Sequence, residues 1–352
     1  MQKENLTYLE NLLNAASPTG YETKARELWR KEMKTITSKV HGDTHGNSYA
    51  MLKGSGNKHR VMIAGHIDEI GFQVKWIDSE GYIKFQPIGG FDTQIVPGRR
   101  VLIHTKDGCV KGVIGKKAIH LMKPEDRKNI PEFSDLWIDI GLNSDKKVKK
   151  LVNVGDYVTY VDGFEKLSDD VCIARGVDDK IGAYIAGEVL RYIKGKKFAA
   201  DVYAVATVQE EIGIRGAKTG AGKINPTVAF AIDVDHANMP DVGDSITGGV
   251  KIGKGPVINC GANFNSKLFE LISATAKKKK IPVQIKAQAG GTGTDANAIQ
   301  LHGDGVPVAL VSIPNRYMHT PVELFSLSDV KNAIAIISET ILALTEKDDF
   351  II

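Results

Sequence analysis

The stretch Val202-Tyr-Ala-Val-Ala-Thr-Val-Gln-Glu-Glu211 is an almost unbroken apolar run that ends in two adjacent carboxylates, Glu210 and Glu211. A β-branched run of this kind is typical of a strand that is buried on both faces of a sheet. Burying and crowding two like charges costs free energy, so a metal ion or a shared proton is the usual way to neutralise one of them. The stretch therefore predicts a buried strand that ends at a polar site.

Segments with helical and strand-like patterns alternate around this run. Amphipathic or long apolar patterns predict helices over residues 6–16, 182–193, 266–280 and 327–344. Short apolar runs predict further strands over residues 61–64 and 228–232. Strands that alternate with helices indicate an α/β fold, in which a mixed, mostly parallel sheet is flanked by helices.

The turn after the first helix contains Ser17-Pro-Thr-Gly20, which should end that helix. Thr19 and Glu22 have the spacing of a capping box. We therefore expect Thr19 to cap a second helix that reaches about Met33.

A different pattern fills residues 71–164, where short β-rich runs are separated by turn signals such as Pro97-Gly98 and Asp107-Gly108. This pattern predicts a small β-barrel or sandwich. We expect residues 71–164 to be a domain inserted into a larger domain formed by residues 1–70 and 165–352.

The composition excludes several classes of protein. Of the 352 residues, 42% are hydrophobic and 25% are charged, which is typical of a globular protein. The formal net charge of +4 is a small surplus rather than a basic tail, so it gives little reason to expect a nucleic-acid partner. No apolar stretch approaches the length of a membrane span, so we expect no membrane partner either. Three widely spaced cysteines suggest a reducing compartment, and we expect the cytoplasm.

Residues of the kind that bind metals follow several of the predicted strands. They are His66, Asp68, Asp178, Glu210, Glu211, Asp233 and His319. Nitrogen and oxygen ligands without cysteine suit zinc, cobalt or manganese in a catalytic site. A site with two metal ions needs a bridging carboxylate, separate ligands for each ion and a base for the water, and adjacent Glu210 and Glu211 could serve as base and ligand.

Five motifs in this order resemble the tetrahedral, or TET, aminopeptidases, and the resemblance covers essentially the whole chain. The motifs are Gly65-His-Ile-Asp-Glu-Ile-Gly-Phe72, Val177-Asp-Asp-Lys-Ile-Gly182, Gln209-Glu-Glu-Ile-Gly-Ile-Arg-Gly-Ala217, Ala231-Ile-Asp-Val-Asp-His-Ala237 and Arg316-Tyr-Met-His-Thr-Pro-Val-Glu323. Some members of this family were once labelled endoglucanases.

The resemblance implies a zinc-exopeptidase-like fold and a role for each candidate. It implies two divalent ions per subunit, with zinc or cobalt expected first and manganese as a further candidate. Asp178 would be the bridge, His66 and Asp233 would hold one ion, and Glu211 and His319 would hold the other. Glu210 would be the general base, and Asp68 would orient His66. Thr294 and Asp295 lie in a segment, residues 290–296, that resembles the family's Gly-rich loop near the substrate.

The implied activity is hydrolysis of the N-terminal peptide bond of small peptides by a metal-activated water. The resemblance also implies that residues 71–164 form a dimerisation domain from which a homo-oligomer, commonly a dodecamer, is built. An additional carboxylate, Asp235, follows Asp233 by two residues, where we expect a small or hydroxyl residue in most relatives. Asp235 could compete as a ligand or alter selectivity.

Three other functions are compatible with parts of this pattern. A deacylase or other amidohydrolase could use the same metal site on a non-peptide amide. An endoglucanase would need two carboxylates on either side of a sugar, a poor match for adjacent Glu210 and Glu211. A non-enzymatic scaffold would use the β-rich segment for assembly alone.

Overall fold

A computed structural model describes residues 3–352, and within this range the largest element is an eight-stranded mixed sheet. Its order is β1 (Val40–Gly42), β2 (Ser48–Leu52), β12 (Asp201–Thr207), β3 (Arg60–His66), β13 (Val228–His236), β16 (Val308–Asn315), β14 (Val257–Gly261) and β15 (Gln284–Gln288). The four central strands, β12, β3, β13 and β16, are parallel. Their carboxyl ends therefore meet at one edge of the sheet.

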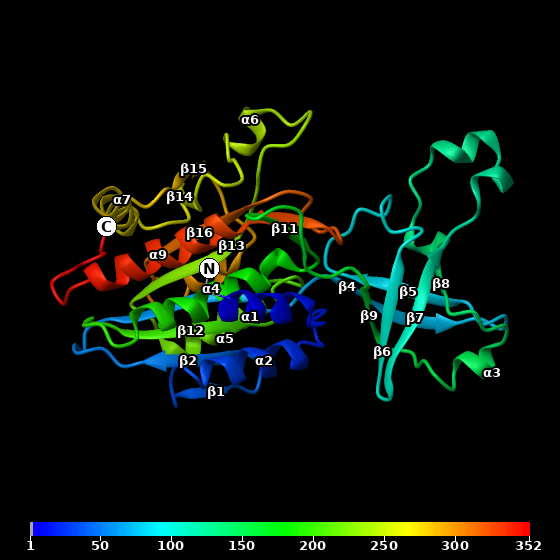
Figure 1. Cartoon of the computed structure of the whole chain (residues 1–352), viewed down its shortest axis with the longest axis horizontal. Coiled ribbons are helices and arrows are strands. Elements are labelled where there is room, and N and C mark those ends of the chain that lie inside the picture. Colours follow the sequence, from blue (N-terminus) through cyan, green and yellow to red (C-terminus); the bar gives the residue numbers. More distant parts are fainter. Residues whose placement is uncertain (1–2) are drawn as a thin grey trace.

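Helices cover both faces of this sheet (Figure 1). The helices on one face are α1 (Lys3–Asn14), α2 (Thr23–Met33), α4 (Val177–Ile193), α7 (Ser266–Lys279) and α9 (Leu327–Ala343). Those on the other face are α5 (Arg215–Ile224) and α8 (Asp295–Ile299). In β3, Val61 and Ile63 join the first core while Met62 and Ala64 join the second, as the two-residue period of a strand requires.

Close packing of α4 against β3 depends on Gly65. A Cβ atom built at Gly65 would lie 2.2 Å from the carbonyl carbon of Gly182 in α4. Because no side chain fits between them, the helix approaches the strand directly before His66. This contact brings the start of α4 to the end of the strand.

A closed six-stranded barrel stands beside the α/β body (Figure 1). In barrel order its strands are β4 (Gly71–Ile77), β5 (Ile83–Ile88), β8 (Trp137–Asp139), β7 (Gly108–Gly115), β6 (Arg100–Thr105) and β9 (Tyr157–Tyr160). Phe72, Phe85, Ile103 and Val158 are buried inside it. The barrel strands lie between residues 71 and 160. Because these strands close on themselves, the chain adopts the barrel and not the sandwich, the two forms that its sequence predicted.

Short elements complete the chain. The barrel carries α3 (Asp145–Val148) and three 3-10 turns, η1 (Ile119–Leu121), η2 (Pro124–Lys128) and η3 (Phe133–Asp135). A small sheet joins β10 (Glu165–Lys166), β11 (Val171–Ala174) and β17 (Glu323–Ser326), and α6 (Asp244–Thr247) stands at the top of Figure 1. The predicted α/β fold with a β-barrel is confirmed. Within residues 3–352, no helix has the length and apolar character to cross a membrane.

The predicted cap of the second helix is wrong. Glu22, not Thr19, precedes the first turn of α2, and it makes no side-chain capping bond. The Thr19 hydroxyl instead donates to Asp68 Oδ2 at 2.8 Å, and the Glu22 carboxylate accepts from the Gly20 amide. A buried carboxylate distant in sequence competes successfully with the local cap, because it needs a donor that solvent cannot supply.

Candidate active site

The predicted ligands gather at the carboxyl edge of the central strands. His66 ends β3, Asp233 lies near the end of β13, and Glu210 and Glu211 follow β12. Asp178 stands at the start of α4, below the same edge. Parallel strands deliver the residues that follow them to one crevice, which is where α/β proteins place their sites.

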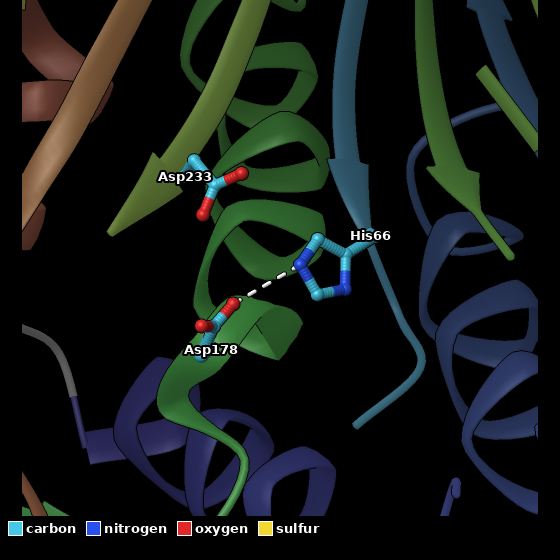
Figure 2. A group of neighbouring side chains, drawn as sticks. All are labelled: His66, Asp178 and Asp233. Atoms are coloured by element: carbon cyan, nitrogen blue, oxygen red, sulfur yellow. Dashed lines mark ion pairs between the residues drawn. The ribbon is translucent and has the colours of Figure 1, made fainter. Parts of the chain in front are cut away.

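Figure 2 shows the first group, in which the side chains of His66, Asp178 and Asp233 face one another. His66 Nε2 lies 3.0 Å from Asp178 Oδ1. One ligand atom from each of the three residues lies within 4.8 Å of the others, and all three residues are buried. The geometry fits a cation held by one imidazole and two carboxylates.

The second group contains Asp178, Glu211 and His319, whose ligand atoms also lie within 4.8 Å of one another. His319 Nε2 is 3.2 Å from Asp178 Oδ2 and 3.6 Å from Glu211 Oε2. Asp178 thus turns one oxygen to each group. A carboxylate that belongs to both groups is the arrangement that a two-metal site requires.

Glu210 stands outside both groups but next to them. Its Oε2 atom lies 3.8 Å from His66 Nε2, and its buried Oε1 atom has no hydrogen-bond partner among residues 3–352. Burial raises the pKa of Glu210 to about 9; nearby His66 opposes this rise, while Asp233, Asp295 and Asp68 add to it. A buried carboxyl with so strongly shifted a pKa, beside the two groups of ligand-type residues, is typical of a functional site.

The site carries more negative charge than its histidines balance. Burial, followed by repulsion from Asp178, raises the pKa of both Glu211 and Asp233. Burial opposes ionisation of Asp178 as well, but hydrogen bonds from His319 and His66 hold its pKa well below the usual range. Glu211 Oε1 also lacks a partner among the described residues. Cations would stabilise these carboxylates, so the residues present fit metal binding.

Comparisons with known proteins agree with this geometry. The sequence pattern of the family described as M42 glutamyl aminopeptidase matches residues 46–336. The chain belongs to this family.

Individual aminopeptidases and peptidases are similar along almost the whole chain. A lysyl aminopeptidase from Pyrococcus furiosus is 35% identical over 329 residues, which are 93% of each chain. The TET aminopeptidase of a marine sediment thaumarchaeote is 34% identical, with a TM-score of 0.94 over 98% of this chain and 97% of that one. The TET1 peptidase of Pyrococcus horikoshii, which can assemble into a tetrahedron or a large octahedral shell, is 32% identical, with a TM-score of 0.85 over 97% and 100% of the chains.

Asp68 ties the first motif of this M42 peptidase to the Glu210–Glu211 turn. Its carboxylate accepts hydrogen bonds from the backbone amides of Glu210 at 3.1 Å and Glu211 at 3.3 Å. His66 Nδ1 lies 3.1 Å from the Asp68 carbonyl oxygen and 3.5 Å from its Oδ1 atom. Asp68 therefore contacts both the imidazole and the turn that carries the two glutamates.

Asp179 supports the site through the backbone. Its Oδ2 atom accepts from the His66 amide at 3.1 Å, and its Oδ1 atom accepts from the Gly182 amide at 3.0 Å. Asp179 therefore binds nearby backbone, whereas Asp178 faces both groups of ligand-type residues. Asp179 joins the start of α4 to the end of β3.

The loop candidates Thr294 and Asp295 are buried. Thr294 caps α8, and Asp295 Oδ2 accepts from the Thr207 hydroxyl at 2.6 Å. Burial raises the pKa of Asp295 to about 6, which His66 and the Thr207 bond oppose and Asp68 assists. Contact of either residue with a substrate stays a prediction.

Asp235 has a partner that the sequence did not indicate. Its Oδ1 atom lies 2.6 Å from Lys286 Nζ in β15. The additional charge is therefore balanced by a cation of the chain. Asp235 belongs to neither of the two candidate groups found among the described residues.

A buried ion cluster below the site was also missed. Arg175 Nη1 donates to both oxygens of Glu69, at 2.6 and 2.5 Å, and Lys180 Nζ lies 3.2 Å from Glu69 Oε1. Burial raises the pKa of Glu69, but Arg175 and Lys180 outweigh it and lower the pKa to about 2. The cluster fixes the segment after β3 against the start of α4. Glu69 lies within the first motif, but the identity of its partners had no sequence signal.

Proposed function

We propose that this M42 peptidase is a metal-dependent aminopeptidase that removes N-terminal residues from small peptides. The observation that carries the proposal is the pair of ligand groups that share Asp178, with Glu210 beside them. His66 and Asp233 would hold one divalent ion, Glu211 and His319 would hold the other, and Asp178 would bridge them. Zinc, cobalt and manganese all suit these ligands.

The bound ions would activate water, polarise the scissile carbonyl and bind the substrate's free α-amine, which restricts cleavage to the chain end. The remaining steps belong to side chains. Glu210 accepts the proton of the attacking water and then passes it to the leaving amine. Burial and the neighbouring carboxylates raise the pKa of Glu210 in the chain without cations, and bound cations would favour its ionised form, in which it can act as a base. Asp68 fixes the position of the His66 imidazole relative to the Glu210 backbone.

The inserted barrel would serve assembly. We propose that residues 1–70 and 165–352 form the catalytic domain and residues 71–164 the dimerisation domain, with dimers building a tetrahedral dodecamer. The segment between β7 and β8 exposes Ile119, Leu121 and Ile130, which are 55%, 72% and 61% exposed. Figure 1 shows this segment rising above the barrel at the upper right, separate from the α/β body. Exposed apolar side chains of this kind suit a protein interface.

We propose that this protein is located in the cytoplasm, a reducing compartment. Cys109, Cys172 and Cys260 are all free thiols, which is usual where disulfides do not persist.

Substrate panels test the activity. Metal-stripped protein is reconstituted with zinc, cobalt or manganese and supplied with aminoacyl p-nitroanilides and with N-acylated amino acids. The aminopeptidase proposal predicts turnover of substrates with a free α-amine and none without added metal. Turnover of the blocked substrates alone would instead identify an amidohydrolase, and the preferred residue follows from the panel.

A further inference from the structure

Glu323 lies behind the second ligand group, at the start of β17. Glu323 pairs with Ala174, at the end of β11, and only 2% of Glu323 is exposed. It thus stands between two turns that approach each other, the one that leads into α4 and the one that follows β16.

The Glu323 carboxylate binds both of these turns. Its Oε2 atom accepts a hydrogen bond from the Asp178 amide at 3.0 Å, and its Oε1 atom accepts one from the His319 amide at 2.8 Å. Asp178 and His319 are separated by 140 residues along the chain, yet one side chain holds the backbone of each. Both are members of the group that also contains Glu211.

The backbone at His319 needs such support. His319 has a φ of 60° and Tyr317 has a φ of 63°, both in the left-handed region that residues with a Cβ atom seldom occupy. Such conformations persist where the surroundings fix them, and the bond from the His319 amide to Glu323 is one such constraint. The direction of the imidazole follows from this backbone conformation.

We infer that Glu323 is a positioning residue for the second metal, because it sets the distance between Asp178 and His319. This inference rests on the proposed function. Glu323 contacts the backbone of two ligands and does not itself belong to either ligand group. Its loss should therefore weaken the Asp178–Glu211–His319 group more than the His66–Asp178–Asp233 group.

Glu323→Gln tests this inference, since glutamine has the same size but only one acceptor oxygen for two amide donors. Asp329→Asn is the matched control. Asp329 is also fully buried and accepts two backbone bonds, from Gly253 and Gly255 at 2.7 Å each, but it binds no ligand residue. Both substitutions remove the same kind of buried bond, and only one of them lies at the site.

The measurements are calorimetric titration of each metal-free protein with Zn²⁺ and the absorption spectrum of its Co²⁺ form. In Glu323→Gln, one of the two Zn²⁺ sites should lose about 10–100-fold in affinity while the other changes less, since this is the usual effect of removing a group that supports a ligand. The Co²⁺ spectrum should change. The kcat should fall, while KM should stay within about twofold of its value in the unsubstituted protein. In Asp329→Asn, both affinities and the spectrum should match the unsubstituted protein, even where thermal stability falls.

The outcomes separate the inference from the proposed function. If the unsubstituted protein binds no Zn²⁺, the proposed function fails. If it binds two ions, and Glu323→Gln binds both with unchanged affinity and spectrum, the positioning role alone is wrong. If Glu323→Gln does not fold, Glu323→Asp replaces it: this variant keeps both acceptor oxygens on a shorter arm, and unaltered Zn²⁺ affinity there would overturn the inference.

Discussion

Replacing Glu210 with glutamine separates proton transfer from metal binding. Glu210 lies outside both ligand groups, and its Oε1 atom has no partner among residues 3–352, so the substitution removes neither a ligand nor a hydrogen bond to that atom. It also removes a carboxylate from a cluster that contains Asp233, Asp295 and Asp68. The Glu210→Gln protein should therefore fold at least as stably as the parent and keep its metal.

The expected loss is in kcat. A general base contributes about 10²–10⁴ in rate, so the barrier should rise by about 3–5 kcal/mol. Steady-state kinetics on an aminoacyl p-nitroanilide and metal content by plasma emission spectroscopy measure the two effects. Glu211→Gln is the contrasting variant, because it should lose metal as well as activity.

Two results would refute this division of roles. Loss of metal from Glu210→Gln would show that Glu210 is a ligand. Retention of kcat within a factor of about five would show that another group moves the proton.

Three further predictions concern pH, packing and assembly. Because the pKa of Glu210 is higher in the folded chain than in the unfolded chain, its contribution to the free energy of unfolding is complete below the ordinary glutamate pKa and is lost as the pH rises toward about 9. The Tm of the metal-free protein should therefore fall from pH 5 to pH 9, and the fall should be smaller in Glu210→Gln. Gly65→Ala should destabilise the fold by about 1–3 kcal/mol or more in urea unfolding, because its Cβ meets the α4 backbone, whereas Gly222→Ala, with open space around it, should not be destabilising. Replacing Ile119 and Leu121 with serine should shift size-exclusion elution toward smaller species without loss of secondary structure by circular dichroism; an unchanged elution volume would contradict the assembly role of that segment.

The residues of both candidate metal-binding groups could be singled out from local patterns. Buried apolar runs such as residues 202–208 are followed directly by charged or polar residues, which are costly to bury without a partner. Because parallel strands end at a common edge, these residues converge when the strands pair. Both groups found among the described residues, with Asp178 in each, consist of residues singled out from the sequence.

Residues that support the ligands could not be predicted in the same way. Glu323 and Glu69 are carboxylates like many others in the chain, and a residue type does not reveal which distant donor it will meet. Thr19 illustrates the same limit, since its spacing to Glu22 matches a capping box but its hydroxyl binds Asp68. In each case a buried contact outweighs the local pattern.

The sequence by itself determined the α/β and barrel segments and the residue types available at the carboxyl edge, because periodicity and burial are properties of local composition. Only the tertiary structure decided how these residues are divided between the two candidate metal-binding groups. Pairing of β12, β3 and β13 brings the ends of separate segments together, and the close contact at Gly65 sets α4 so that Asp178 faces both His66 and His319. The physical reason is that distances between ligands depend on packing across the whole sheet, which no local pattern records.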